Sequence, residues 1–284
     1  MPAASSASAA SETVKPQLGG VPETLLIPLW ARAQEQARSA PIIVDPDAAR
    51  IVAALDYDFG QFRAKRVETE NFCVRAKVLD DLISQILRES PGRTVVEFGP
   101  GLDTRFHRLG HLAERWIEVD LPEVIALRER FFPPDPSRAV VGCSMLDEEW
   151  IVEVGNSFDQ PPLFIAEGVF YFFSHDQIRR FLSGLKDSFP NAGVVFDAVS
   201  SLYLKLSNMR HPLTTSSLQF ALSADAAEIT TWDPGMSIED YVGYGDSPFY
   251  DGLMHRFAWW KRFAVSAIPS VRHSFMIVHV GLND

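Results

Sequence analysis

The chain has 284 residues, of which 46% are hydrophobic and 22% are charged, so it can bury a large core as one or two domains. Its 37 acidic residues outnumber the 26 basic ones and give a formal net charge of -11. Proteins that bind nucleic acids usually carry an excess of basic residues, so this charge disfavours a DNA or RNA substrate. The sequence also contains no apolar run near the roughly 20 residues that a membrane-spanning helix needs.

The first 20 residues, MPAASSASAASETVKPQLGG, are mostly small or polar. They lack the basic segment and the apolar segment of a secretory signal, so we expect residues 1–20 to form a disordered tail. Cys73 and Cys143 are too few for a disulfide framework and are typical of buried thiols in a reducing compartment. We therefore expect a cytoplasmic protein.

Helical patterns fill residues 21–90, which we expect to form an N-terminal helical cap. The segment ETLLIPLWARAQEQARSA has apolar residues at helical spacing, and DPDAARIVAAL opens with an Asp-Pro start signal. The segment NFCVRAKVLDDLISQILRES has one broad apolar face and ends before Pro91 and Gly92.

From residue 91 onward, strand patterns alternate with helical ones. The expected strands are RTVVEFG, RWIEVD, RAVVGC, PLFIAEG, AGVVFDAV and, last, HSFMIVHVGL. Apolar strands separated by helices indicate an α/β fold with a doubly wound, mostly parallel, Rossmann-like sheet covered on both faces. We expect residues 91–284 to form this core, interrupted by a polar, Gly- and Pro-marked lid insertion at about residues 201–256.

The first expected strand runs into a glycine turn, from Glu97 to Gly101, with the sequence EFGPG. Ligands of such sheets bind beyond the carboxyl ends of the strands, and glycine lets the backbone approach them closely. A P-loop requires Gly-Lys-Ser/Thr, but Leu102 and Asp103 follow the turn. A dinucleotide fingerprint requires a third glycine where Thr104 stands, and Asp103 would repel a pyrophosphate. Phosphate and dinucleotide ligands are therefore disfavoured.

A third ligand, S-adenosylmethionine, suits the acidic residues around the turn. Glu97 precedes the first glycine by two residues, and Asp120 ends the strand pattern RWIEVD. A carboxylate at the position of Asp120 can accept hydrogen bonds from both ribose hydroxyls. Asp120 is also a plausible N-cap for a helix that begins at Pro122. The two carboxylates together favour S-adenosylmethionine.

Five longer segments resemble the leucine carboxyl methyltransferase family. They are GVPETLLIPLWARA, CVRAKVLD, GPGLDTRFHRL, EVDLPEVIALRERFF and LFIAEGVFYF, between about residues 21 and 200, with TWDPG as a weaker match beyond. The bacterial branch, which includes tetracenomycin-type polyketide O-methyltransferases, is the most similar. The resemblance implies a class I methyltransferase fold, S-adenosylmethionine as the cofactor, and methyl transfer to oxygen.

The resemblance also implies roles for individual residues. Arg75 would pair with the methionyl carboxylate of the cofactor, which a guanidinium can bond bidentately. Glu167, at the end of the fourth strand, would lie beside the methionine end and the substrate. The other implied cofactor residues are Glu97, Gly99 and Gly101 at the turn, Asp120 and Leu121 at the ribose, and Ser144, Met145 and Asp147 at the adenine.

The sequence departs from the family pattern at three places. Pro100 replaces the commoner alanine of the glycine turn and is expected to stiffen it. Ser144 stands where the eukaryotic members carry aspartate, which leaves the adenine contacts open. Phe172 stands where tyrosine is expected, with Tyr171 one residue earlier, which leaves open any substrate role of a phenol.

The acceptor is expected to be a small acidic or phenolic molecule. A carboxylic acid, with a pKa of about 4, is already a nucleophile at neutral pH, whereas a phenol, at about 10, normally needs a general base. The sequence presents no obvious base, which favours a carboxylate of a polyketide-like substrate. A phenol or hydroxyl O-methyltransferase and a non-catalytic cofactor-binding protein remain alternatives. The weak catalytic candidates are Glu167, Tyr171, Tyr203, Arg210 and His211.

Two other patterns have simpler interpretations. Ser174, His175 and Asp176 contain the residue types of a nucleophile triad, but neighbours on one helix start cannot form the relay. Ser174 with Gln177 predicts a capping box instead. The histidines show no zinc-like pairing with cysteine, so we expect no metal site.

Overall fold

A computed structural model of the chain describes residues 13–18, 22–64, 69–155, 158–210, 218–246, 254–256 and 259–284. Most of the expected tail, residues 1–12, lies outside this part. Residues 13–18 are described, and the backbone N–H of Val14 donates to the carbonyl of Ala54 at 2.8 Å. Val14 and Leu18 pack against the N-terminal helices, which places this part of the expected tail on the folded protein.

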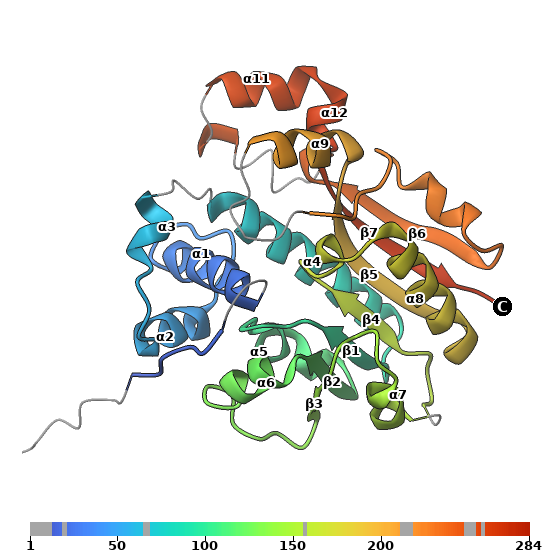
Figure 1. Cartoon of the computed structure of the whole chain (residues 1–284). Helices are drawn as coiled ribbons and strands as arrows, with labels where there is room; N and C mark the ends of the chain where they lie inside the picture. The colour runs from blue at the N-terminus through green and yellow to red at the C-terminus, as the bar shows by residue number, and fades with distance from the viewer. Residues whose placement is uncertain are drawn as a thin grey trace, which may run out of the picture.

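The described residues form one seven-stranded sheet with the order β3-β2-β1-β4-β5-β7-β6 (Figure 1). The strands are β1 (Thr94–Phe98), β2 (Arg115–Asp120), β3 (Arg138–Gly142), β4 (Leu163–Ala166), β5 (Ala192–Val199), β6 (Met236–Gly243) and β7 (Phe275–Leu282). Strands β1 to β5 are parallel, and β7 runs antiparallel between β5 and β6. The expected doubly wound, mostly parallel sheet is confirmed, and all six expected strands are present.

Strand β6 was not expected, because its residues fell in the predicted lid insertion. Its sequence MSIEDYVG alternates poorly, and the register shifts between Ile238 and Asp240 where β6 pairs with β7. An edge strand needs only one partner and tolerates such irregularity and charge. Residues 236–243 therefore belong to the sheet.

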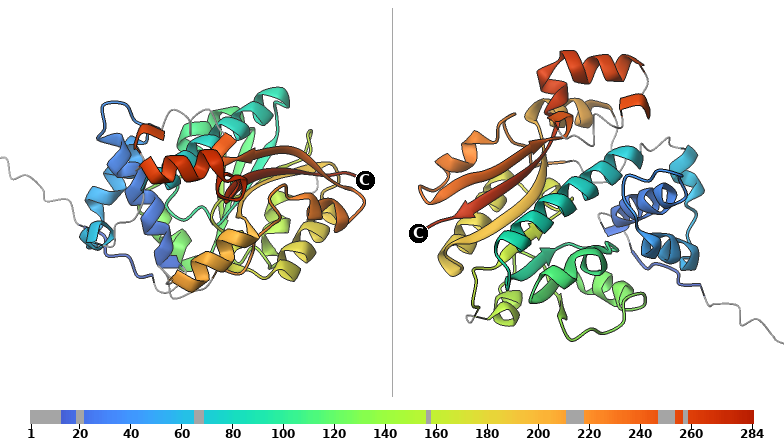
Figure 2. Two further views of the ribbon diagram at one scale, coloured as in Figure 1. Left: turned by 90° about the horizontal axis from the view of Figure 1, so that it is seen from above. Right: turned by 180° about the vertical axis from the view of Figure 1, so that it is seen from behind.

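Helices cover both faces of the sheet (Figures 1 and 2). They are α1 (Leu26–Gln36), α2 (Pro46–Ala54), α3 (Gly60–Ala64), α4 (Thr69–Glu89), α5 (Arg105–Leu109), α6 (Pro122–Arg128), α7 (Glu149–Val154), α8 (His175–Ser188), α9 (Ser201–Arg210), α11 (Trp259–Ala267) and α12 (Pro269–Arg272). The predicted capping box is confirmed at α8, where the hydroxyl of Ser174 accepts the Gln177 N–H and the Gln177 side chain accepts the Ser174 N–H. None of the helices among the described residues is long and apolar enough to span a bilayer.

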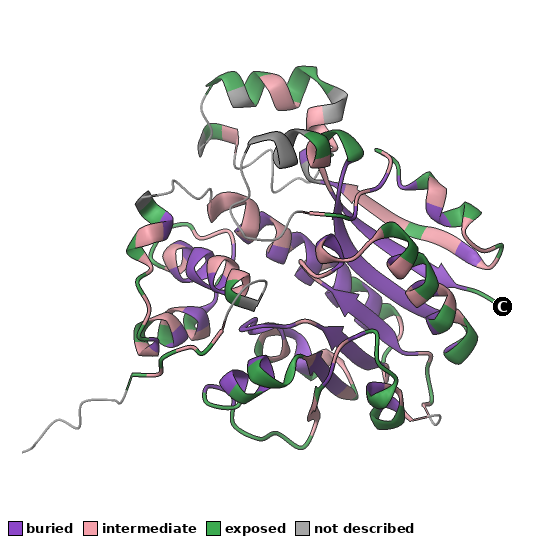
Figure 3. Ribbon diagram, in the orientation of Figure 1, coloured by how far each residue is buried: buried purple, intermediate pink, exposed green. Residues whose placement is uncertain are grey.

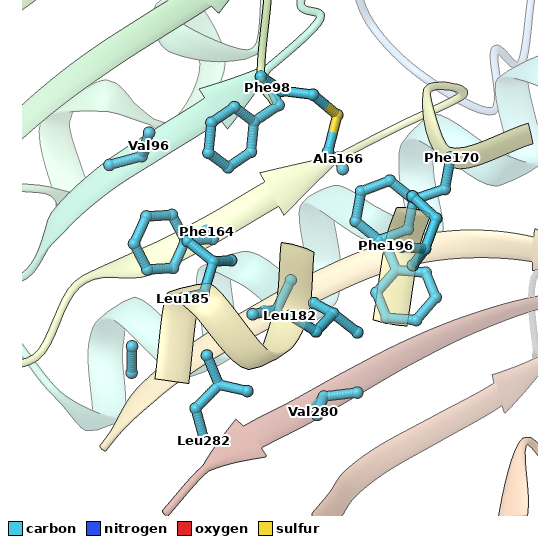
Figure 4. Packing of buried hydrophobic residues seen from close by; sticks show 14 of the residues in the cluster. Val96, Phe98, Phe164, Ala166, Phe170, Leu182, Leu185, Phe196, Val280 and Leu282 are labelled. Carbon is cyan, nitrogen blue, oxygen red and sulfur yellow. The ribbon is translucent and has the colours of Figure 1, made fainter. Parts of the chain in front are cut away.

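The two faces of the sheet differ in composition. The aromatic face, covered by α7 and α8, is an apolar cluster that includes Val96, Phe98, Phe164, Phe170 and Phe196 (Figure 4). The charged face, covered by α4 and α5, combines an apolar half with acidic side chains toward the carboxyl ends of the strands. Figure 3 shows that the strands between these layers are mostly buried.

Helices α1, α2 and α3 form a group beside the sheet, whereas α4 packs both on the sheet and on α1 (Figure 1). Apolar residues of the group contact Leu102, just after the glycine turn, and Leu127 and Phe131 at the end of α6. The helical group thus lies against the carboxyl edge of β1 and β2, where the sequence placed the cofactor turn.

Candidate active site

The predicted cofactor residues come together along the carboxyl edge of the parallel strands. Asp120 ends β2 and pairs in register with Gly142, the last residue of β3. Phe98, which ends β1, pairs with Val119 of β2 and Ala166 of β4. The segments that follow these strands are therefore neighbours in space, since parallel strands end at one edge of the sheet.

The glycine turn depends on both glycines. Gly99 and Gly101 have φ values of +59° and +53°, a region that only glycine adopts without strain. A Cβ at Gly99 would lie 2.4 Å from Cγ2 of Val169, and one at Gly101 would lie 2.9 Å from Cβ of Leu25. The turn is thus held between the loop after β4 and the N-terminal helices, and no side chain fits at either glycine.

Asp120 holds the turn through its carboxylate. One oxygen accepts the backbone N–H of Gly101 at 2.8 Å, and the other accepts the N–H of Leu121 at 2.8 Å. Burial raises the pKa of Asp120, although these two hydrogen bonds act in the opposite direction. Pro122 is the first residue of α6, as its start signal predicted. Asp120 therefore lies at the turn, and its predicted bond to the ribose stays a prediction.

The turn after β3 lies next to Asp120. The N–H of Ser144 donates to Asp147 at 3.0 Å, and the N–H of Leu146 donates to the Ser144 hydroxyl at 3.2 Å. Met145 is buried, and its carbonyl accepts the indole N–H of Trp150 at 3.1 Å. This compact turn places Ser144, Met145 and Asp147 at the carboxyl edge of the sheet, and their predicted contact with the adenine stays a prediction.

Arg75 projects from α4 to the loop after β4. Its Nε donates to Oε1 of Glu167 at 2.7 Å, and its Nη1 donates to Oδ2 of Asp197 at 3.2 Å. The Arg75 side chain is 12% exposed. A Cβ on Gly168, whose φ is +72°, would lie 3.3 Å from the guanidinium. Arg75 and Glu167 thus form an ion pair beside the glycine turn.

Glu97 lies in a different environment from the one its spacing suggested. Its carboxylate accepts from Nη1 of Arg105 at 2.6 Å and from the indole N–H of Trp116 at 3.0 Å, and its side chain is buried. Burial raises its pKa to about 7, against the effect of Arg105. Residue 97 shares a face with Val95, so its side chain points under α4 and α5 and away from the turn.

Arg105, the residue that follows Thr104, is the centre of this buried charge network. Its guanidinium donates to Asp80 at 2.8 Å, to Glu97 and to Glu167. Burial raises the pKa of Glu167, but Arg75 and Arg105 outweigh that effect and hold it below its ordinary value. Glu167 therefore stays ionised at neutral pH.

Asp103 joins the same network from the far side of the turn. Burial raises its pKa, but Arg32, Arg105 and Arg108 hold it well below the ordinary value. Arg128 donates to the carbonyls of Gly101 and Asp103 at 2.7 and 2.8 Å and forms an ion pair with Glu118. The arginines thus fix the backbone that shapes the turn.

Among the weak catalytic candidates, Glu167 and Tyr171 are linked through Arg75 and Asp197. The Tyr171 hydroxyl donates to Oδ2 of Asp197 at 2.6 Å. Tyr203 of α9 packs on Phe275, with ring centroids 4.4 Å apart, and burial raises its pKa. Arg210 ends α9, but its side chain, like the whole of His211, lies outside the described residues.

Two residues of this site were missed in the sequence, Asp197 and Arg105. Asp197 is the charged residue of the otherwise apolar strand pattern AGVVFDAV, and a buried charge requires a partner. Arg105 directly follows the turn that was recognised. Both signals were visible, but neither identifies a partner. The hydrogen-bond partners of Arg105 lie 8 to 62 residues away in sequence, and Arg75 lies 122 residues from Asp197.

One cluster of potential metal ligands occurs near the turn after β3. Donor atoms of Cys143, Asp147 and Glu149 lie within 4.8 Å of one another. Burial raises the pKa of the Cys143 thiol, and Asp147 already accepts the N–H of Ser144. A protonated thiol is a poor metal ligand, which argues against a metal at this cluster. The expected lack of a metal site stays a prediction.

Comparison with known proteins agrees with this geometry. A family model described as leucine carboxyl methyltransferase matches residues 26–186. The tetracenomycin polyketide synthesis O-methyltransferase TcmP of Streptomyces glaucescens is 29% identical over 240 residues, which cover 84% of this chain and 87% of that protein. The S-adenosyl-L-methionine-dependent methyltransferase dpfgK of Gibberella zeae is 30% identical over 274 residues, covering 87% and 92% of the two chains.

A solved structure is similar in fold. A chain of the complex that contains the Haloferax volcanii Trm112 methyltransferase activator superposes with a TM-score of 0.50. It is 12% identical, and the match covers 74% of this chain and 96% of that one. At this identity the similarity concerns the fold alone.

Proposed function

This chain belongs to the leucine carboxyl methyltransferase family and is an S-adenosylmethionine-dependent O-methyltransferase, and we propose that it methylates the carboxylate of a small, polyketide-like acid. The cofactor assignment to individual residues is part of this proposal, as is the nature of the acceptor.

The residues at the carboxyl edge fit the cofactor. The glycine turn offers backbone without side chains, because a Cβ at Gly99 or Gly101 would collide with Val169 or Leu25. Asp120 supplies carboxylate oxygens, which accept hydrogen bonds from ribose hydroxyls. The turn from Ser144 to Asp147 is the neighbouring surface for the adenine. These groups are neutral or acidic, which suits a sulfonium ligand better than a phosphate.

The ion pair of Arg75 and Glu167 is the observation that carries the proposal. The methionine end of the cofactor is a zwitterion with one carboxylate and one ammonium group. Arg75 presents a guanidinium and Glu167 an ionised carboxylate, joined at 2.7 Å beside the glycine turn. Opposite charges at this spacing match the two charges of the ligand, and charge-assisted hydrogen bonds are the strong ones. Glu97 is not among the contacts that we propose, because Arg105 and Trp116 occupy its carboxylate.

The chain contributes orientation and exclusion of water. When bound, the cofactor supplies an activated methyl group on its sulfonium. The glycine turn, Asp120 and the Arg75–Glu167 pair hold the cofactor in one orientation, and the N-terminal helices cover the turn through Leu25. Holding two reactants in a reactive geometry accounts for much of the rate gain in such transfers.

The charge states of the described candidates favour a carboxylate acceptor. Glu167 has a lowered pKa and lies between two guanidinium groups, so it is a weak base. The Tyr171 hydroxyl donates a hydrogen bond to the buried carboxylate of Asp197. A carboxylate acceptor, unlike a phenol, needs no base at neutral pH. The role of TcmP in polyketide synthesis supports a polyketide-like acid.

The cofactor site is tested by calorimetry with S-adenosylhomocysteine, the demethylated product. Arg75→Ala and Asp120→Asn should each weaken binding at least about tenfold, because each removes a hydrogen bond to or from a charged group. Arg115→Ala, which removes an exposed arginine paired with Glu153, is the matched control and should bind like the parent chain. Unchanged affinity in the first two variants would refute the site.

The acceptor is tested by a methyl-transfer screen over aromatic acids and phenols. A product mass increased by one methyl group, and lost again in mild alkali, would identify a methyl ester. An alkali-stable methyl ether would contradict the carboxylate proposal and support the phenol alternative.

A further inference from the structure

The strand β5 carries an acidic residue with no access to solvent. The Asp197 side chain is 0% exposed, although it lies on the charged face close to the carboxyl edge of the sheet. Its neighbours in the strand are buried and apolar. An ionised group placed there loses its hydration, and this loss is compensated only if several donors reach it.

Three donors reach Asp197, from three parts of the chain. One oxygen accepts the backbone N–H of Gly168 at 2.6 Å. The other accepts the Tyr171 hydroxyl at 2.6 Å and Nη1 of Arg75 at 3.2 Å. Gly168 and Tyr171 belong to the loop after β4, and Arg75 belongs to α4. Asp197 therefore ties the guanidinium to the loop that carries Glu167.

We propose that Asp197 is a positioning residue for cofactor binding, which fixes the guanidinium of Arg75 against the loop from Glu167 to Tyr171. The inference rests on the role proposed above for Arg75 and goes beyond it, since Asp197 cannot reach a ligand itself. A carboxylate with no exposed surface acts only through the groups it bonds.

The geometry of Arg75 supports this role. A long side chain on a helix populates many rotamers, and ordering it costs free energy on binding. Glu167 bonds Nε and Asp197 bonds Nη1, so two carboxylates, one just after β4 and one within β5, define the plane of the guanidinium. The charge of Asp197 also offsets part of the repulsion between Arg75 and Arg105, which share Glu167. Without Asp197 the same guanidinium would be less ordered before the ligand arrives.

Two ligands separate this role from a structural one. S-adenosylhomocysteine carries the amino-acid end, whereas 5′-methylthioadenosine has the same adenosine and thioether without it. Asp197→Asn removes the negative charge that faces Arg75, so binding of S-adenosylhomocysteine should weaken about tenfold while binding of 5′-methylthioadenosine stays within about twofold. Calorimetry gives both dissociation constants. The measured quantity is the dissociation constant of S-adenosylhomocysteine divided by that of 5′-methylthioadenosine.

Glu118→Gln is the matched control. Glu118 is also fully buried on the charged face and bonds Arg128 and Arg138, but it does not contact Arg75. Its loss should lower the melting temperature and leave the ratio of the two dissociation constants unchanged. Tyr171→Phe removes one donor to Asp197 without removing charge, and should raise the ratio about threefold. If Asp197→Asn fails to fold, Tyr171→Phe decides the question.

A double-variant cycle distinguishes the inference from the proposed function. In an Arg75→Ala background, Asp197→Asn should have no further effect on S-adenosylhomocysteine. If Arg75→Ala weakens S-adenosylhomocysteine but Asp197→Asn leaves the ratio unchanged, the positioning role is refuted and the proposed site stands. If Arg75→Ala itself has no effect, the proposed site fails. A further loss from Asp197→Asn in the Arg75→Ala background would also overturn the positioning role.

Discussion

The two faces of the sheet are built from different interactions. On the aromatic face, Phe98, Trp150, Phe164 and Phe189 pack ring against ring, with centroids 5.0 to 6.0 Å apart. On the charged face, toward the carboxyl ends of the strands, buried or partly buried carboxylates lie beside arginines. The acidic residues are Glu97, Glu118, Asp120, Glu167 and Asp197, and the arginines that contact four of them are Arg75, Arg105, Arg128 and Arg138.

The difference separates stability from function. Apolar packing stabilises a fold through buried area and is indifferent to pH. Buried ion pairs often stabilise little relative to apolar residues of the same shape, but losing one partner is costly. The charged face is therefore a costly way to fill a core, and it coincides with the edge where we place the cofactor. We infer that the charged face serves to orient charged groups at this edge.

The largest effect is expected from breaking the charged face at its centre. Arg105→Met should reduce the free energy of unfolding by about 5 kcal/mol near pH 8, because Glu97, Asp80 and Glu167 lose a buried partner. Chemical denaturation measures this loss.

The loss should shrink at lower pH. The pKa of Glu97 in the folded protein is already raised to about 7, above its ordinary value of 4.5, and removing Arg105 raises it further. A carboxyl group whose pKa is higher in the folded than in the unfolded chain contributes its full stability below the unfolded-state pKa. It loses that contribution as the pH rises through the folded-state pKa. The variant should therefore be less impaired at pH 5 than at pH 8. An equal loss at both values would contradict the electrostatic origin.

The matching change on the aromatic face is Phe164→Ala. It removes a fully buried ring from the cluster in Figure 4 and should cost about 4 kcal/mol. Because the ring packs within an apolar cluster, the loss should be the same at pH 5 and pH 8. A pH-dependent loss would mean that the two faces are not energetically separate.

A smaller effect is expected at the turn between the faces. Gly99→Ala should cost about 2 kcal/mol, because alanine is strained at a φ of +59° and its Cβ meets the stiff side chain of Val169. Gly184→Ala, in α8 with no atom near the new Cβ, should instead stabilise the protein by about 0.5–1 kcal/mol. Melting temperatures of the two variants should move in opposite directions, and a shift of the same sign would disprove the steric argument.

The smallest effect concerns the helix that covers the aromatic face. Ser174→Ala removes the capping hydroxyl of α8 and should cost about 1 kcal/mol. Ser183→Ala, in the interior of the same helix, should change the unfolding free energy by no more than about 0.5 kcal/mol. Equal costs at the two serines would indicate that the hydroxyl at the cap is not the cause.

The local patterns of the sequence predicted much of this structure. Apolar strand runs, the glycine turn and the Ser174 cap depend on neighbouring residues, and each is present in the structure. Strand β6 was missed because an irregular edge strand has no strong periodicity. The sequence placed α4 in the helical cap, whereas it covers the sheet, because helical spacing does not say which surface an apolar face meets.

The candidate site was predictable in position but not in contacts. Asp120, Gly99 and Gly101 lie at strand ends, where topology alone brings them together. The partners of Glu97 could not be predicted, because whether a strand residue faces the ligand or the core depends on which face the neighbouring helices cover. Arg105 and Asp197 meet their partners through long-range packing that single-sequence patterns do not encode.

The position of β7 also bears on how the protein assembles during synthesis. Among the described strands β7 is the last in chain order, yet it lies between β5 and β6 and hydrogen-bonds to both. Until residues up to Leu282 emerge from the ribosome, β5 has an exposed edge and β6 has no place in the sheet. Exposed strand edges promote aggregation in partly folded chains. The nascent chain therefore remains vulnerable until β7 has been made, and only then can β5, β7 and β6 join in one sheet.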